Sequence, residues 1–312
     1  MVIRQKRIER NGEATPFFQK SLEEYLTGAL IVLSCVLYLA HAYFYNFIAD
    51  DSFITLRYAQ NLAEGHGLVF NPNERVEGFT SFLWTVMLAG MYILGCDLLL
   101  SARWVGLAFG LITLILAYRL VLACSDRQVP SFMAAFVPLA LASNGSFACW
   151  SASGMETMLY ICLIVASFLT VISGNIILSA LLAIALVLTR PEGVGVLVIL
   201  SLYQIMQLRK GSPKQVLIWL TVCWSASAAL FVFRYFYYGD WFPNTYYVKT
   251  GGGFQAARRG IAYLIQYAKD HEGLIFMILP VIYGFLINNI KQRLMALAVT
   301  FLWFGTVMVG GD

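Results

Sequence analysis

Residues 27–48 read TGALIVLSCVLYLAHAYFYNFI and contain no Asp, Glu, Lys or Arg. A helix needs about 20 such residues to cross a hydrocarbon core of about 30 Å. Because lipid offers no hydrogen bonds, every peptide group in the run must be paired within the segment, as it is in a helix. Of the 312 residues, 60% are hydrophobic and 12% are charged, and the mean hydropathy is +0.73. A soluble domain has about twice that charged fraction. The sequence therefore predicts an all-α polytopic membrane protein.

Nine further apolar segments follow the first one. They lie near 81–98, 104–123, 131–149, 155–173, 175–189, 193–208, 215–238, 272–289 and 294–309. No low-complexity tract, Ser/Pro-rich linker or clear repeat separates them, which indicates one membrane domain over 27–312. The preceding tail, 1–26, is basic and lacks a cleavage site, so we expect the first segment to remain as a signal anchor.

Lysine and arginine in the loops indicate the orientation, because cytoplasmic loops carry an excess of them. Basic residues gather in the tail, in the 209–214 loop and in the 288–293 loop. Ten full crossings would not place all three on the cytoplasmic face. We therefore expect about nine spans in the cytoplasmic (inner) membrane, with 81–98 as a re-entrant or juxtamembrane helix. It would belong to a first outer loop of about 50–103.

On this topology, 12 of the 17 acidic residues lie on the outer side or at its boundary, several of them at helix ends. Asp50 and Asp51 directly follow the first span. Two adjacent carboxylates at a hydrocarbon boundary repel each other and lose solvation. Such a pair suits a general base or a divalent cation, and a solvated helix terminus is the other interpretation. We expect the chemistry on the outer face.

Other outer motifs carry polar residues suited to binding a substrate. The stretch FITLRYAQNLAEGHG at 53–67 reads as a short helix on the membrane surface, ended by Gly65 and Gly67. The motifs are LVFNPNERVEGFTS at 68–81, SASGMET at 151–157, LTRPEG at 188–193, YGDWFPNTYYVK at 238–249 and the final GGD at 310–312. Each of three motifs also has a simpler interpretation. The 68–81 motif could be a surface loop, Ser153 and Glu156 could form a capping box, and the tyrosines of 238–249 could belong to an interfacial aromatic belt.

Several classes of site have no signature in the sequence. There is no Walker loop, GxSxG or HExxH motif, and His41, His66 and His271 show no metal-ligand spacing. No basic cluster interleaved with aromatic residues points to nucleic acid. The six cysteines lie in or beside apolar runs and read as small buried hydrophobic residues.

Taken together, the motifs resemble the arabinofuranosyltransferase-like family of membrane glycosyltransferases. DDSFITLRYAQNLAEGHGLVFNPNERVEGFTSFLW is similar to the first outer loop of that family. SGMET, LTRPEG, YYGDWFPNTYYVK and GGD are similar to its later signatures, in the same order. The resemblance covers roughly 45–312. It implies a GT-C-type transmembrane bundle with juxtamembrane helices in the first outer loop, a polyprenyl-phosphate sugar donor and a catalytic acid at the outer end of the first span.

The resulting hypothesis is an inverting transfer of a sugar from a polyprenyl-phosphate donor to a hydroxyl of a glycan, lipid or protein acceptor of the cell envelope. Asp50 or Asp51 would act as the general base, and basic side chains would bind the phosphate leaving group. The expected substrate-binding residues are Arg57, Tyr58, Arg75, Glu77, Glu156, Arg190, Glu192, Asn244, Tyr247, Lys249 and Asp312. Membrane lipid is an expected partner and nucleic acid is not. The candidate cofactor is a divalent cation at Asp50 and Asp51.

Such proteins usually continue past the GGD motif with more spans and an outer soluble domain. We therefore expect the 312-residue chain to lack that C-terminal domain and, alone, to transfer a sugar slowly or not at all. Two alternatives are kept. One is a non-catalytic assembly subunit, and the other is a transporter or lipid flippase, whose acidic residues should lie near the middle of the membrane.

Overall fold

The computed structural model describes residues 16–209, 212–244, 247, 254–270, 282–283, 286 and 289–308. Within these residues the secondary structure is helical, without a strand. The elements are α1 (Pro16–Tyr45), α2 (Asp50–Ala63), α3 (Phe82–Ile93), α4 (Leu98–Cys124), α5 (Ser131–Ala134), α6 (Phe136–Ser143), α7 (Gly145–Ser151), α8 (Thr157–Ile172), α9 (Ile176–Thr189), α10 (Gly193–Met206), the 3-10 helix η1 (Gln207–Arg209), α11 (Pro213–Tyr238), α13 (Phe254–Asp270) and α15 (Ile290–Met308).

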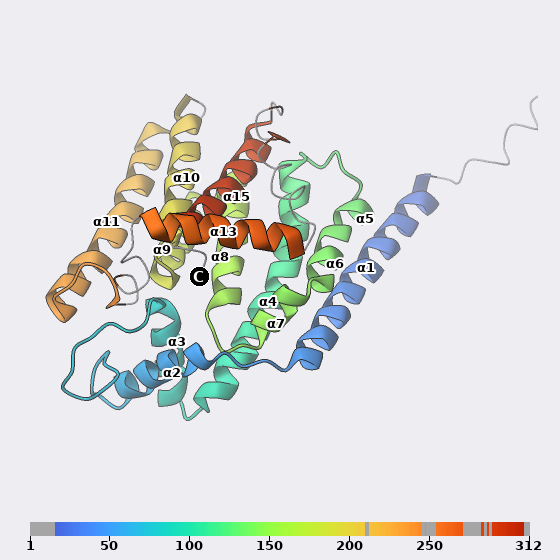
Figure 1. Cartoon of the computed structure of the whole chain (residues 1–312). Coiled ribbons are helices and arrows are strands. Elements are labelled where there is room, and N and C mark those ends of the chain that lie inside the picture. Colours follow the sequence, from blue (N-terminus) through green and yellow to red (C-terminus); the bar gives the residue numbers. More distant parts are fainter. Residues whose placement is uncertain are drawn as a thin grey trace, which may run out of the picture.

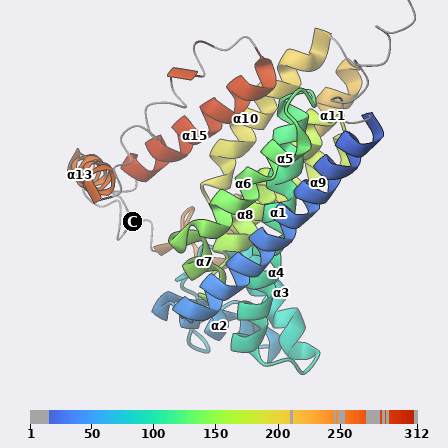
Figure 2. The same ribbon diagram turned by 90° about the vertical axis from the view of Figure 1, so that its right-hand side faces the viewer.

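The longer helices form a bundle, and α2 and α3 lie together at one end of it (Figures 1 and 2). Helix α8 packs between α4 and α9, and α1 packs against α4, α6 and α7. The largest buried cluster joins α8–α11 with α2, α3 and α15 through side chains such as Leu56, Trp84, Leu197 and Trp219. Helices α2 and α3 are therefore part of the folded core. Their shared end of the bundle is called the α2 end below.

Among the described residues, three helices are long and apolar enough to cross a membrane, namely Ser21–Tyr45, Leu98–Cys124 and Pro213–Tyr238. A fourth span is possible if the bent pair Ser131–Ser143 and Gly145–Ser151 counts as one. The protein is thus a helical membrane protein. Helices α8, α9 and α10 match the apolar segments predicted near 155–173, 175–189 and 193–208 but are shorter than a full span. The total of nine spans stays a prediction, and most of the 272–289 segment lies outside the described residues.

Helix α3 has 12 residues, which corresponds to a length of about 18 Å at 1.5 Å per residue. That length is too short to cross a hydrocarbon core of about 30 Å. In Figure 1, α3 lies beside α2, and α4 begins at that same end. This is the arrangement that a non-crossing 81–98 segment requires.

The apolar segment predicted near 131–149 is broken into three helices. The chain forms α5, α6 and α7 there, and the axis bends by 65° between Ser131–Ser143 and Gly145–Ser151. Pro138 has no N–H to donate to the carbonyl of Ala134, which ends α5 at that residue. Asn144 then starts α7, because its side chain accepts a hydrogen bond from the Phe147 N–H.

A helix that the sequence did not predict lies between the apolar segments predicted near 215–238 and 272–289. Residues Phe254–Asp270 form the amphipathic helix α13, which packs against α15. In Figure 2 this helix is seen end-on, beside α15 and away from the rest of the bundle. Its apolar residues recur at helical spacing without forming a continuous apolar run, so a search for spans passes over it.

Small residues on α4 allow neighbouring helices to approach closely. Gly106 and Gly110 are spaced as in a GxxxG motif. A Cβ atom on Gly106 would overlap the Ser151 carbonyl oxygen of α7, and one on Gly110 would overlap the Tyr38 hydroxyl of α1. The Tyr38 hydroxyl donates a hydrogen bond to the Leu107 carbonyl at 3.2 Å.

We predict that Gly106→Ala destabilises the protein by about 1–3 kcal/mol, because the new methyl group meets backbone that must shift. Gly90→Ala is the matched control, since a Cβ on Gly90 meets no atom within 4 Å. Thermal unfolding in detergent would measure both variants. Equal stability of the two variants would contradict the close α4–α7 contact.

The side of the membrane on which the α3–α4 turn lies can be tested with a native residue. Cys96 is exposed in this turn, whereas Cys35 and Cys149 are partly buried and the other three cysteines are buried. We predict that a membrane-impermeant maleimide labels Cys96 in intact cells and that Cys96→Ser removes the label.

A cysteine at the exposed Gln128 is the control for the opposite end of the bundle. In the Cys96→Ser background, Gln128→Cys should be labelled only after permeabilisation. If instead the native Cys96 reacts only after permeabilisation, the topology with nine spans is wrong.

Candidate active site

The acidic pair Asp50–Asp51 forms the first turn of α2, and both side chains are exposed. Acidic residues in a first turn interact favourably with the helix dipole, so the pair also stabilises the start of α2. The Ser52 hydroxyl donates to the Ala49 carbonyl at 2.6 Å and is buried. Inward-facing residues of α2 such as Leu56 and Ala59 join the core. The helix is therefore held along one side, and its first turn presents the two carboxylates outward.

The 151–157 motif packs directly against this turn. The Ala49 N–H donates to the Ser153 carbonyl at 3.0 Å. Gly154 has φ +81°, and a Cβ there would come within 3.0 Å of the Ser52 side chain. Only glycine combines this backbone conformation with so close an approach. The Gly154 carbonyl also accepts a hydrogen bond from the Trp84 indole N–H at 3.1 Å, which joins α3 to the same contact.

An ion-pair cluster links the 151–157 and 188–193 motifs. The Arg190 guanidinium lies 3.4 Å from a carboxylate oxygen of Glu156 and 3.3 Å from one of Glu192. Glu156 is buried, with a side chain 2% exposed, while Arg190 and Glu192 are partly exposed. Two carboxylates share one guanidinium. Burial raises the pKa of Glu156, and the Arg190 guanidinium opposes that rise. The capping box is not formed, because the Ser153 hydroxyl accepts from the Met155 N–H and Glu156 faces Arg190.

The 68–81 loop folds back over the second half of α2. The Tyr58 hydroxyl donates to the Val76 carbonyl at 2.6 Å and accepts from the Gly78 N–H at 2.8 Å. The Asn61 amide donates to the carbonyls of Val69 and Phe70, both at 2.8 Å. These bonds satisfy four backbone groups of an irregular segment and fix its path on the helix.

A buried ion pair holds the same loop to the end of α11. The Arg234 Nε donates to a carboxylate oxygen of Glu77 at 2.9 Å, and the two side chains are 2% and 5% exposed. The Asn244 N–H donates to the Glu77 backbone carbonyl at 2.9 Å. Burial raises the pKa of Glu77, and the Arg234 guanidinium opposes that rise.

Aromatic side chains of α11 add further contacts to the loop. The hydroxyls of Tyr237 and Tyr238 bond to the Leu68 N–H at 3.1 Å and the Leu68 carbonyl at 2.8 Å, respectively. The Arg75 guanidinium lies over the Tyr237 ring, 4.9 Å from its centroid. The loop is thus held by α2 on one side and by α11 on the other.

The structure brings most of the predicted motifs to the α2 end of the bundle. Ala49 and Ser52, which flank Asp50 and Asp51, contact the 151–157 motif. Glu156 and Glu192 both pair with Arg190, and the Asn244 N–H donates to the Glu77 carbonyl. Arg57 and Tyr247 are exposed, and Arg57 donates to the Phe70 carbonyl at 3.3 Å. Lys249 and Asp312 lie outside the described residues. No group of three or more His, Cys, Asp or Glu side chains suited to a metal occurs among the described residues.

Sequence reasoning missed Arg234, Tyr237 and Trp84. All three lie in predicted apolar segments. Trp84 and Tyr237 also stand at the ends of two motifs of the family resemblance, but no role was predicted for either. A charged residue within an apolar segment is a signal in itself, because it needs a partner there. Arg234 could have been singled out on that ground, although its partner Glu77, 157 residues away, could not.

Comparison with known proteins shows similarity to a glycosyltransferase. The chain is similar to the terminal β-(1→2)-arabinofuranosyltransferase of Mycobacterium tuberculosis. The identity is 28% over 269 residues, which cover 79% of this chain. The chain spans 42% of the length of that relative. No protein-family model matches the chain. The comparison supports a distant relationship to an arabinofuranosyltransferase.

The Glu77–Arg234 pair predicts a specific pattern of stability. Arg234→Met should cost about 3–5 kcal/mol near neutral pH, because it leaves a buried carboxylate without its partner. The double variant Glu77→Gln/Arg234→Met should recover most of that loss, since a neutral amide takes the place of the buried charge. Thermal unfolding in detergent, analysed as a double-mutant cycle, would measure the coupling.

The loss in Arg234→Met should also depend on pH. In the unfolded chain Glu77 titrates near its usual pKa of 4.5, and in the folded protein its pKa is raised. Between the two values the folded state holds a proton that the unfolded state has released, so lowering the pH favours folding. Removing Arg234 removes the opposing charge, and the Arg234→Met variant should therefore regain stability as the pH falls from neutral toward 5. A loss that does not change over this range would contradict a buried charged pair.

Proposed function

We propose that this protein is a membrane glycosyltransferase that moves a sugar from a polyprenyl-phosphate donor to an acceptor hydroxyl at the α2 end of the bundle. The observation that carries the proposal is the exposed Asp50–Asp51 pair, held by Ser52, Ser153 and α3 among polar loops. The distant relationship to an arabinofuranosyltransferase supports a sugar as the transferred group. We place this end on the outer face of the cytoplasmic membrane, as the loop charges predict.

The proposed reaction needs a base on one side of the donor sugar and positive charge on the other. The acceptor oxygen attacks the anomeric carbon while its proton moves to a carboxylate of Asp50 or Asp51. The bond from that carbon to the phosphate oxygen breaks, and the bonding electrons leave with the polyprenyl phosphate. Attack opposite to the leaving group inverts the anomeric configuration.

Among the described basic residues, Arg57 is the best placed to bind the leaving phosphate. It lies seven residues after Asp50, which places both on the same face of α2 about 10 Å apart along the axis. Arg190 is already shared by Glu156 and Glu192, so an added phosphate would have to compete with two carboxylates. Arg75 lies over the Tyr237 ring and is a second candidate. We assign Arg190 to holding two loops together, and the phosphate to Arg57 with Arg75.

We predict that Asp50→Asn or Asp51→Asn lowers sugar transfer by about 10²–10⁴-fold, the usual contribution of a general base. Asp50 is the preferred candidate, because it is nearer to the first span and so to a lipid phosphate. Membranes containing each variant would be incubated with a radiolabelled polyprenyl-phosphate pentose, and labelled product would be counted.

Asp97→Asn is the matched control for this experiment. Asp97 is another exposed aspartate near α2, and its side chain caps α4 by accepting from the Leu100 N–H at 2.8 Å. Asparagine also caps helices well, so this variant should keep wild-type transfer. Full activity in both Asp50→Asn and Asp51→Asn would rule out a carboxylate base at this turn.

A further inference from the structure

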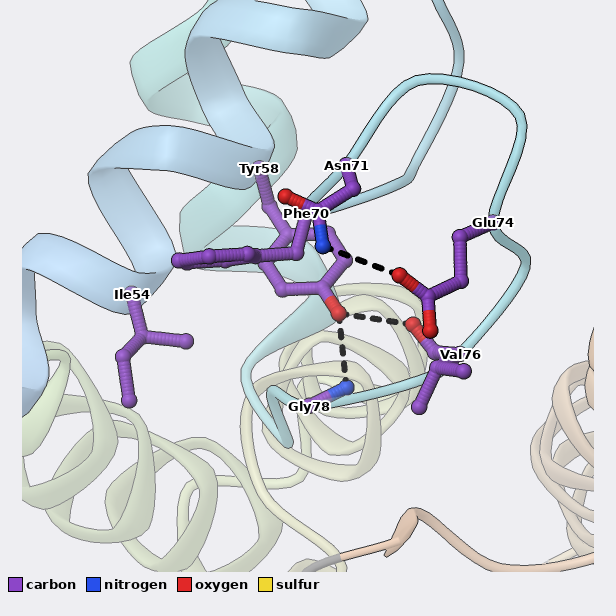
Figure 3. Close-up of a pocket in the computed structure, with 7 residues that line it drawn as sticks. All are labelled: Ile54, Tyr58, Phe70, Asn71, Glu74, Val76 and Gly78. Atoms are coloured by element: carbon purple, nitrogen blue, oxygen red, sulfur yellow. Dashed lines mark hydrogen bonds between the residues drawn. The ribbon is translucent and has the colours of Figure 1, made fainter.

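A cavity of about 280 Å³ opens beside α2, between the helix and the 68–81 loop. Ile54 and Tyr58 of α2 line one side, and Phe70, Asn71, Glu74 and Val76 of the loop line the other (Figure 3). It is separate from the acidic pair and from the Arg190 cluster, and nothing above assigns it a ligand. The size is slightly below the usual range of ligand pockets, which is about 300–1,000 Å³. The space suits one or two sugar rings.

We propose that this cavity binds a saccharide unit of the acceptor, an inference that rests on the proposed sugar transfer. Its chemistry is that of a carbohydrate site. Phe70, Val76 and Ile54 are 42%, 39% and 36% exposed and offer an apolar surface for the C–H face of a sugar ring. Glu74 and Asn71 are exposed at the same cavity and offer a carboxylate and an amide for hydroxyl groups.

The walls of the cavity are fixed before any ligand arrives. The Tyr58 hydroxyl bonds to Val76 and Gly78, as the dashed lines in Figure 3 show. The Phe70 carbonyl accepts from both Arg57 and Asn61. The Asn71 amide donates to a carboxylate oxygen of Glu74 at 2.9 Å, which holds the two polar side chains together. A preformed site loses less entropy on binding than a mobile loop would.

The position of the cavity relative to the acidic pair assigns the saccharide to the acceptor. Ile54 lies one turn after Asp50 and Asp51 on the same face of α2, and Tyr58 lies two turns after them. Along the helix axis these separations are about 6 Å and 12 Å from Asp50. One or two sugar units held here would place the next unit of the same glycan at the carboxylates, where its hydroxyl loses a proton.

Charge argues against the lipid donor as the occupant. Glu74 lines the cavity, and its carboxylate would repel a phosphate there, whereas Arg57 and Arg75, to which the phosphate is assigned, do not line it. The Glu74 carboxylate would also lose solvation against a hydrocarbon tail. A neutral saccharide has neither conflict, because its hydroxyl groups can donate to the carboxylate.

The test measures binding directly and needs no transfer activity. A fluorescent arabinofuranosyl trisaccharide would be titrated into the full chain in detergent, with mannosyl and glucosyl trisaccharides in parallel. Binding of at least one trisaccharide is expected. Phe70→Ala should weaken it about tenfold through loss of the aromatic surface. Ile54→Trp, which fills the cavity from the α2 side, should weaken it at least as much, and Glu74→Gln should weaken it several-fold.

Matched controls lie on the same helix outside the cavity. Phe53 is 52% exposed and Glu64 is exposed, so Phe53→Ala and Glu64→Gln should leave binding unchanged. Thermal unfolding of every variant would separate lost binding from lost folding. Farnesyl phosphate serves as a soluble mimic of the donor lipid and should not displace the trisaccharide.

Three outcomes would overturn the proposal. They are no trisaccharide binding by the wild-type chain, equal binding by wild type and the three cavity variants, or displacement by farnesyl phosphate. Failure of the transfer hypothesis would look different. In that case Asp50→Asn and Asp51→Asn would keep full transfer, while trisaccharide binding still depended on Phe70.

Discussion

Hydrocarbon cannot hydrogen-bond a peptide group, and this constraint determines where a site can form in this protein. Inside the membrane the backbone must be helical, so irregular segments belong at the ends of the bundle. The turn at 46–49, the 68–81 loop and the 152–156 and 190–192 segments are all irregular, and their contacts bring them to the α2 end. Polar side chains far apart in the sequence therefore gather there.

The buried Glu77–Arg234 pair has a similar origin. An arginine near the end of an apolar helix needs a carboxylate, and the loop supplies one. Moving the loop away would leave a buried charge without its partner, so the ion pair fixes the loop to α11. Tyr58 and Asn61 fix the same loop to α2. The walls of the cavity beside α2 are rigid for this reason. The ion pair therefore stabilises the wall of a cavity that neither of its members lines.

Helix α2 combines three roles through its periodicity. Its inner face carries Leu56 and Ala59 into the core, its first turn presents Asp50 and Asp51, and the next two turns face the cavity. The proposed base and the proposed saccharide surface share one helix and so keep a constant spacing, because a helix is stiffer than a loop. Arg190 is already paired with Glu156 and Glu192. Among the described residues, Arg57 and Arg75 are therefore the ones proposed to bind the phosphate.

The sequence by itself determined the class of structure and the identity of the candidate motifs. Apolar length and polarity are local properties, so the segments that match α4, α8–α11 and α15 could be predicted. Helix α2 could be predicted as well, with its ending at Gly65 and Gly67, where φ is +83° and +89°. The breaks at Ala135 and Asn144 were missed, because a single missing N–H at Pro138 does not change the hydrophobicity of the segment. Helix α13 was missed, because its apolar and polar residues alternate at helical spacing and form no apolar run. Only the tertiary structure decided which motifs meet. Glu77 and Arg234 lie 157 residues apart, and a pairing over that distance depends on how whole helices pack, which no local pattern encodes.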